Sequence, residues 1–108
     1  MFSIIIPSLN NLKYLKLCIY SLKKNSKYNH EIIVHVNLGD DGTIDYLKNE
    51  NIKFSYTNYN AGICEGVNKA AMLSTTNYLL YSHDDFYFCP EWDEVLMNEL
   101  KLLKTDLF

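Results

Sequence analysis

Cysteine, proline and glycine are scarce in this 108-residue chain, which contains three, two and four of them. The cysteines are Cys18, Cys64 and Cys89, and none belongs to a CxxC pair of the kind that binds zinc or exchanges disulfides. We therefore expect reduced, mostly buried thiols in a reducing compartment. No Pro/Gly-rich linker, repeat or low-complexity tract divides the chain, so residues 1–108 are predicted to form one domain.

The chain also lacks a marked excess of one charge and any long hydrophobic run. Its formal net charge is −3 with acids and bases mixed, so no basic stripe favours nucleic acid as a partner. The apolar run from Phe2 to Pro7 is too short for a signal peptide or a membrane span. A hydrophobic content of 48% is too high for a disordered chain. We expect a cytoplasmic domain, although a partner could hold it at a membrane.

Short apolar runs alternate with amphipathic segments along the chain. Strands are predicted at Phe2–Ile6 (ended by Pro7), Glu31–Asn37, Ile52–Tyr56 and Tyr78–Tyr81, the last apolar on both sides and therefore buried. Helices are predicted at residues 12–24 (capped by Asn10 or Asn11), Thr43–Lys48, Ile63–Ser74 and Glu91–Lys104. This order predicts an α/β fold of three layers, with a mostly parallel, Rossmann-like sheet between helices.

Polar clusters follow three of the predicted strands. They are Pro7-Ser8-Leu9-Asn10, the loop from Asn37 to Gly42, and His83-Asp84-Asp85. Because parallel sheets bind ligands at the carboxyl ends of their strands, we expect the three clusters to face one crevice. Carboxylates held there suit hard cations such as Mg²⁺ or Mn²⁺, which prefer oxygen ligands. An acidic pair taken alone is as typical of a solvated turn or a helix cap.

Four motifs in order and at matching spacing resemble the family 2 glycosyltransferases of the GT-A fold. The opening strand with Pro7-Ser8-Leu9-Asn10 resembles the P-[ST]-x-N turn, and Asp41-Gly42-Thr43 resembles the D-G-T loop. Asn60-Ala61-Gly62 followed by Asn68 resembles the N-x-G…N segment. His83-Asp84-Asp85 with Pro90 and Trp92 beyond it resembles the D-x-D motif and its P-x-W sequel. The likeness covers almost the whole chain.

This resemblance implies roles for individual residues. Pro7, Ser8 and Asn10 would surround the base and ribose of a nucleotide-diphosphate sugar, and Asp85 would bind the Mn²⁺ or Mg²⁺ that bridges its diphosphate. Asp84 would reach the ribose or the metal. The remaining residues expected to bind the donor are Asn37, Asp41, Gly62, Asn68 and His83.

The sequence departs from the family pattern at three positions. His83 replaces the first acid of D-x-D, no acid follows the second strand near Asn37, and Val67 stands where an arginine is common. Turn formation with helix capping is an equally good reading of Asp41. The family's general base lies well beyond D-x-D, so the acceptor-binding half is expected to be absent from this chain.

The leading hypothesis is therefore a metal-assisted, inverting glycosyltransferase of which this chain supplies the donor-binding half. The acceptor is unknown, and a partner domain or self-association could cover the face left by the missing half. The alternative is a non-catalytic nucleotide-binding or protein-interaction module of the same fold. A metal-dependent nucleotidyltransferase fits less well, because Pro7-Ser8-Leu9-Asn10-Asn11 is neither glycine-rich nor basic.

Overall fold

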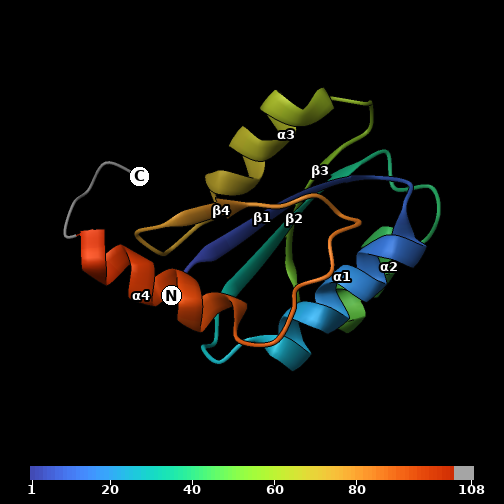
Figure 1. Ribbon diagram of the computed structural model, residues 1–108. Helices are drawn as coiled ribbons and strands as arrows, with labels where there is room; N and C mark the ends of the chain where they lie inside the picture. Colours follow the sequence, from blue (N-terminus) through green and yellow to red (C-terminus); the bar gives the residue numbers. More distant parts are fainter. Residues whose placement is uncertain (104–108) are drawn as a thin grey trace.

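The computed structural model describes residues 1–103, in which strands and helices alternate (Figure 1). The strands are β1 (Ser3–Leu9), β2 (Glu31–Asn37), β3 (Lys53–Thr57) and β4 (Leu79–Tyr81). The helices are α1 (Leu12–Asn25), α2 (Thr43–Asn49), α3 (Gly62–Ala71) and α4 (Trp92–Leu103). The strands pair in the order β3-β2-β1-β4, and each pairing is parallel. The predicted α/β class and the parallel, Rossmann-like sheet are confirmed.

Alternating side chains of the central strands divide the core into two parts. Ile4 and Ile6 of β1 face α1, α2 and α4, whereas Ile5 between them faces α3. Figure 1 shows the resulting layers, with α3 alone on one face of the sheet. The larger part of the core is lined from α1 by Leu15, Cys18, Ile19 and Leu22, from α2 by Leu47, and from α4 by Trp92, Leu96, Met97 and Leu100. No helix among residues 1–103 is long and apolar enough to cross a membrane.

Strand β1 continues through Pro7, so the prediction that Pro7 ends it was wrong. The amide of Ser3 donates to Tyr78 O on the β4 side, and the alternation of a strand places the nitrogen of Pro7 on the same side. The last pair between β1 and β4 is Ile5 with Tyr81, so Pro7 lies beyond the end of β4. Its missing N–H therefore costs no hydrogen bond with that strand.

Strand β4 is an exposed edge strand, not the buried strand that its apolar sequence predicts. Leu79 is 54% exposed and Tyr81 is 42% exposed, while Leu80 between them packs on the core. Alternation puts Leu79 and Tyr81 on the α3 side of the sheet, where α3 lies over β1 and β2. One side of β4 is therefore uncovered by the described residues.

Two further predictions needed correction and one falls outside the described residues. Cys18 is buried, but Cys64 and Cys89 are exposed because they lie on the outer side of α3 and in the segment before α4. Helix α4 begins at Trp92, since Glu91 has a left-handed φ of 67°. The predicted end of this helix at Lys104 lies outside the described residues.

A buried pair, His30 with Asp93, ties α4 to the first strand. Nε2 of His30 lies 2.8 Å from Oδ2 of Asp93, and both side chains are at most 2% exposed. The backbone amide of Phe2 donates to Nδ1 of His30, which fixes the Nε2–H tautomer that donates to Asp93. Burial alone would raise the pKa of Asp93, but hydrogen bonds from the amides of Lys27 and Tyr28 and from His30 outweigh it and lower that pKa.

Helix α3 approaches the sheet closely because Gly66 has no side chain. The imidazole of His35 is completely buried beneath it, with Nδ1 2.7 Å from Ser55 Oγ and Nε2 3.1 Å from Thr57 Oγ1. Burial lowers the pKa of His35, so its neutral form is favoured. A Cβ at position 66 would lie 2.8 Å from Cδ2 of His35, too close for this packing.

Gly66→Ala should therefore destabilise the domain, although alanine is the better helix former. Overpacking costs about 1–3 kcal/mol and the gain in helix propensity offsets about 1 kcal/mol of this, so we expect a net loss of up to about 2 kcal/mol. Urea unfolding followed by circular dichroism measures the change. Cys64→Ala, at an exposed position of the same helix, is the matched control and should leave the midpoint nearly unchanged. Equal midpoints for the two variants would contradict the close approach.

Candidate functional site

The order of the strands creates a switch point beside β1. The chain moves outward from β1 through β2 to β3 and then returns to the other side of β1 as β4. In such sheets the ligand crevice lies outside the carboxyl ends of the strands that flank the switch. A cleft of about 390 Å³ opens at this place. It is lined by Pro7, Ser8, Leu9, Asn11, Asn37, Asn60, Gly62, Ile63, Tyr81, His83 and Asp84.

One hydrogen bond joins the two strand ends across the switch point. The buried Ser8 Oγ at the end of β1 donates to Asp84 Oδ2, 2.8 Å away in the turn after β4. Asp85 comes next and is exposed, and its carboxylate forms no hydrogen bond or ion pair with another residue of the described range 1–103. One carboxylate is thus fixed by the sheet, and its neighbour stands open to a ligand.

His83 is held at the cleft by aromatic contacts. Its ring lies 5.1 Å from that of Tyr81 and 5.0 Å from that of Phe86, and the Tyr81 hydroxyl is 3.4 Å from Nε2. The imidazole is exposed, so the side that faces the cleft is accessible to solvent and to a ligand.

Asn37 lies at the end of β2, next to Leu9 of β1, and is only 4% exposed. Its Oδ1 accepts hydrogen bonds from the amide of Ala61, 2.9 Å away, and from Thr57 Oγ1, 3.3 Å away. The carbonyl side of the amide therefore fixes the loop before α3. Because Oδ1 is already bonded, Asn37 would contact a ligand through its NH₂ group, as a hydrogen-bond donor.

Asp41 contacts the starts of two helices. Its Oδ2 accepts the amide of Leu12, the first residue of α1, at 2.9 Å, and its Oδ1 accepts the hydroxyl of Thr43, the first residue of α2, at 2.5 Å. Asn11 stands at the N-cap position of α1, as predicted, but its side chain forms no capping hydrogen bond, and Asn10 Oδ1 instead accepts the amide of Asp40. Burial works to raise the pKa of Asp41, but hydrogen bonds led by that from Thr43 Oγ1 lower it overall.

The structure brings six of the ten predicted site residues to the cleft. They are Pro7, Ser8, Asn37, Gly62, His83 and Asp84. Asn10 and Asp41 are outside the lining, where their side chains accept the amides of Asp40 and Leu12. Asn68 is exposed further along α3, and Asp85 follows Asp84 outside the lining. Direct roles for these residues stay predictions.

Sequence reasoning assigned no role in the cleft to Leu9, Asn11, Asn60, Ile63 and Tyr81, which also line it. Asn60 and Ile63 lie on either side of the predicted Gly62, and Tyr81 precedes the predicted acidic turn. Their closeness in sequence to these motifs could have identified them as cleft residues. Tyrosine on a strand is more often part of a packed face, and this made Tyr81 inconspicuous.

The donor set at this edge fits a cation that is completed by its ligand. Among residues 1–103 no group of three His, Cys, Asp or Glu side chains could hold a metal ion. Asp85, with or without Asp84, offers only one or two carboxylates. Mg²⁺ and Mn²⁺ accept such incomplete sets because they keep water and add phosphate oxygens from a substrate.

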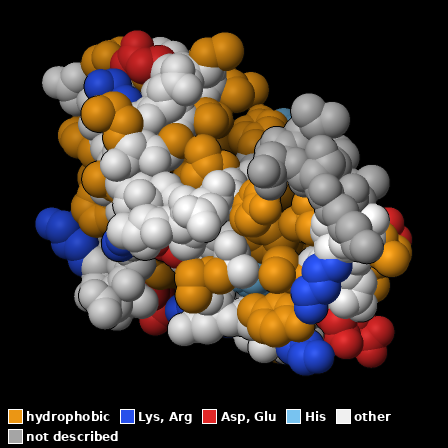
Figure 2. All heavy atoms as spheres, turned by 90° about the vertical axis from the view of Figure 1, so that its left-hand side faces the viewer, with side chains coloured by type: hydrophobic (Ala, Val, Ile, Leu, Met, Phe, Trp, Pro, Cys, Tyr) orange, Lys and Arg blue, Asp and Glu red, His pale blue; other side chains and the backbone are white. Residues whose placement is uncertain are grey.

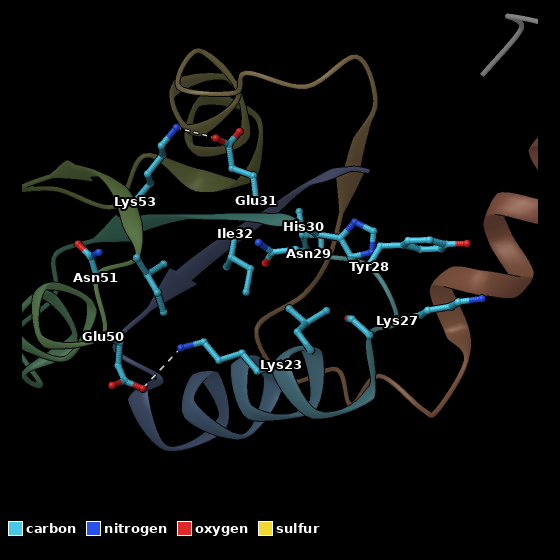
Figure 3. Close-up of a pocket in the computed structure, with 14 residues that line it drawn as sticks. Lys23, Lys27, Tyr28, Asn29, His30, Glu31, Ile32, Glu50, Asn51 and Lys53 are labelled. Carbon is cyan, nitrogen blue, oxygen red and sulfur yellow. Dashed lines mark hydrogen bonds and ion pairs between the residues drawn. The ribbon is translucent and has the colours of Figure 1, made fainter.

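A larger hollow, of about 500 Å³, lies at the amino ends of β2 and β3, opposite the carboxyl ends that form the cleft (Figure 3). Its charged side chains are already paired: Lys23 lies 3.7 Å from Glu50, and Lys53 lies 2.6 Å from Glu31. Burial opposes a low pKa for Glu31, but hydrogen bonds led by that from Lys53 lower it to about 2. Because these charges neutralise one another at the amino ends of β2 and β3, we place the functional site at the carboxyl ends.

The comparison with protein families gives a match over almost the whole chain. The model of "Glycosyl transferase family 2" matches residues 3–108. No curated protein is significantly similar in sequence to this chain.

Solved structures of longer proteins share the fold. S. aureus TarS superposes with a TM-score of 0.83 at 23% identity, and its complex with UDP with a TM-score of 0.82. The mannosyltransferase PcManGT from Pyrobaculum calidifontis, in complex with GDP-Man and Mn²⁺, gives a TM-score of 0.76 at 15% identity. In each case 97% of this chain is covered, but only 33% of the TarS chains and 32% of PcManGT. The chain thus spans about a third of the length of these solved chains, of which the TarS ones comprise residues 1–349, and 20% of a longer TarS chain.

Asp41→Ala should destabilise the domain by removing the cap of α1. Loss of such a cap costs about 1 kcal/mol at neutral pH. Because the folded pKa of Asp41 is below its ordinary value of 3.8, the stabilisation by its carboxylate is present above pH 3.8 and is lost as the pH falls through the folded pKa. Urea unfolding of both proteins at several pH values measures this difference. Asp40→Ala is the control, and a variant as stable as wild type at pH 7 would refute the cap.

Proposed function

This chain belongs to glycosyl transferase family 2, and we propose that it forms the donor-binding half of an enzyme that transfers a sugar from a nucleotide diphosphate. The observation that carries the proposal is the hydrogen bond between Ser8 and Asp84. It joins the end of β1 to the acidic turn, beside an exposed carboxylate, at the switch point of the sheet. A nucleotide lying across the strand ends would place its phosphates next to that carboxylate.

The cleft offers different chemistry along its length. Pro7 and the NH₂ group of Asn37 lie on the β1–β2 side, where an apolar ring and hydrogen-bond donors suit a base and its ribose. His83 and Asp84 lie on the β4 side, where Asp84 can accept from a ribose hydroxyl. Gly62 opens α3 with a φ of 77° and open space at its Cβ position, which leaves room for the ligand.

We propose Asp85 as the protein ligand of a divalent cation, Mn²⁺ or Mg²⁺. Bound there, the cation would neutralise charge on the diphosphate leaving group. The exposed carboxylate, free of protein partners among residues 1–103, and the nearby Asp84 support this role. That PcManGT is described with GDP-Man and Mn²⁺, and TarS with UDP, supports the same ligand class for this chain.

Transfer itself needs an acceptor and a base. In the proposed reaction the hydroxyl of an acceptor attacks the anomeric carbon, the bond to the diphosphate breaks, and the configuration inverts. The hydroxyl proton goes to a general base, which we place outside this chain. Glu91 is exposed at the start of α4, and the buried Asp93 is bound to His30, so neither serves this role well. A cytoplasmic site of action stays a prediction.

We also propose that further polypeptide covers the open side of β4. Figure 2 shows hydrophobic side chains gathered on the side of the molecule where α4 and the start of β4 lie. An uncovered edge strand with apolar side chains is prone to pair with other chains. The extra length of TarS and PcManGT supports a second structural half as the natural cover, and without it a second copy of this chain would serve.

Asp85→Ala should abolish Mn²⁺-dependent binding of a nucleotide diphosphate. Calorimetric titration of the 108-residue chain with UDP and with GDP, each with Mn²⁺ and with EDTA, measures the metal-dependent part. We expect at least about a tenfold loss of affinity in Mn²⁺, since the variant removes a charged ligand. Asp45→Ala, an exposed carboxylate on α2, is the matched control and should bind as wild type does.

Unchanged binding by Asp85→Ala would refute the metal site, and absence of nucleotide binding by the wild type would refute the donor site as a whole. Slow hydrolysis of a bound nucleotide sugar would separate a working half-enzyme from a non-catalytic module of the same fold.

Leu79→Glu should weaken self-association of the chain at millimolar concentration by at least about tenfold, because it places a charge on the open apolar edge. Sedimentation velocity measures the change. Leu17→Glu is the control, since Leu17 is exposed to a similar degree on α1. A wild type that stays monomeric, or equal effects of both variants, would count against β4 as the contact.

A further inference from the structure

The segment that carries the acidic pair has little structure of its own. Between Ser82 and Trp92 it forms no helix or strand, and its internal backbone hydrogen bonds are from Phe86 to His83 at 3.4 Å and from Trp92 to Cys89 at 3.3 Å. Both bonds are long. The position of Asp84 and Asp85 must therefore be set largely by contacts with other elements.

Besides Ser8 of β1, which binds Asp84, one stripe of α1 supplies these contacts. Cys18, Ser21 and Asn25 are spaced three and four residues apart, so they share a face of the helix. Cys18 Sγ lies 3.7 Å from His83 O, on one side of the acidic pair. On the other side Ser21 Oγ accepts the amide of Phe88 at 2.9 Å, and Asn25 Nδ2 donates to Phe88 O at 2.7 Å.

Burial makes these bonds stable. Cys18 and Ser21 are 0% exposed, so water does not compete for their partners. Burial raises the pKa of the Cys18 thiol to about 11, which keeps it protonated as a donor to His83 O. The Phe88 ring adds an apolar anchor, 4.8 Å from that of Trp92.

We propose that Ser21 and Asn25 are positioning residues, which grip Phe88 so that the turn of Asp84 and Asp85 is held at the cleft. The expected effect of these residues on nucleotide binding rests on the proposed function. Their expected effect on the position of the turn does not. Each residue satisfies one polar group of the Phe88 backbone. Loss of either leaves that group without a partner and frees the segment between His83 and Phe88 to move.

The test compares Ser21→Ala and Asn25→Ala in the full chain with a matched control. Ser26→Ala removes one hydrogen bond to a serine hydroxyl, because Ser26 Oγ accepts from Trp92 Nε1 at 3.0 Å, but it leaves both backbone hydrogen bonds of Phe88 in place. Amide hydrogen exchange without ligand should become faster at Phe86, whose amide donates to His83 O within the turn, and at Phe88 in the first two variants and not in the control. Titration with UDP and with GDP should show affinity in Mn²⁺ weakened by about 10- to 100-fold, with a smaller loss in EDTA, where only the contact of Asp84 with the ribose is disturbed.

Unchanged exchange at Phe86 in the folded variants would overturn the inference, as would equal losses of affinity with and without Mn²⁺. If the wild type binds neither nucleotide, the proposed function fails, and the exchange measurement alone still decides whether α1 holds the turn. If Ser21→Ala does not fold, Asn25→Ala decides by the same measurements, because Asn25 is only partly buried at the end of α1.

Discussion

The parallel pairing of β1 with a strand on each side is the constraint on which the rest of the structure depends. Ser8 pairs in register with Val36 of β2, and Ile5 with Tyr81 of β4, so the chain leaves all three strands at one edge. Parallel strands must be joined by crossovers, and these carry α1, α2 and α3 onto the two faces. Polar groups separated by more than 70 residues in sequence, such as Ser8 and Asp84, then meet at hydrogen-bonding distance. The direction of the strands therefore determines where the cleft lies, whichever polar residues line it.

Hydrogen bonds from side chains to the backbone then convert this approximate convergence into a defined site. Asn37 binds the loop before α3, Asp41 binds the start of α1, and Ser21 binds the segment after the acidic pair. These contacts fix the backbone of the irregular segments, as the hydrogen bonds between strands fix the backbone of the sheet. The amino-end edge of the sheet contrasts with this arrangement, because there the charged side chains of Glu31 and Lys53 pair with each other. At the amino ends of the strands the charges neutralise one another and stabilise the fold. At the carboxyl ends the carboxylate of Asp85 has no such partner among residues 1–103 and can bind a ligand.

Much of this fold was predictable from sequence, because its elements follow local patterns. The order of strands and helices, the parallel sheet and the meeting of Ser8 with the acidic turn all followed from hydrophobic periodicity and one topological rule. Other features depend on the tertiary structure. Asp41 caps a helix start that lies 29 residues earlier, and no local pattern shows such a contact. Pro7 is tolerated because β4 is short, and β4 is exposed because α3 lies over its neighbours. Ser21 appears in the sequence as one more polar residue of an amphipathic helix, and only the folded chain shows the amide it binds.

The pair of His30 and Asp93 has a consequence for the way the chain is made. The imidazole joins the amide of Phe2 to a carboxylate in the first turn of α4, and that carboxylate also accepts the amides of Lys27 and Tyr28. A nascent chain that has not yet reached residue 93 lacks the group that satisfies these donors, although its central strands are complete. The sheet can assemble early during synthesis, but closure of its amino end must wait for α4 to emerge from the ribosome. A chain cut before residue 93 would therefore expose the unsatisfied amides and the aromatic surface around them.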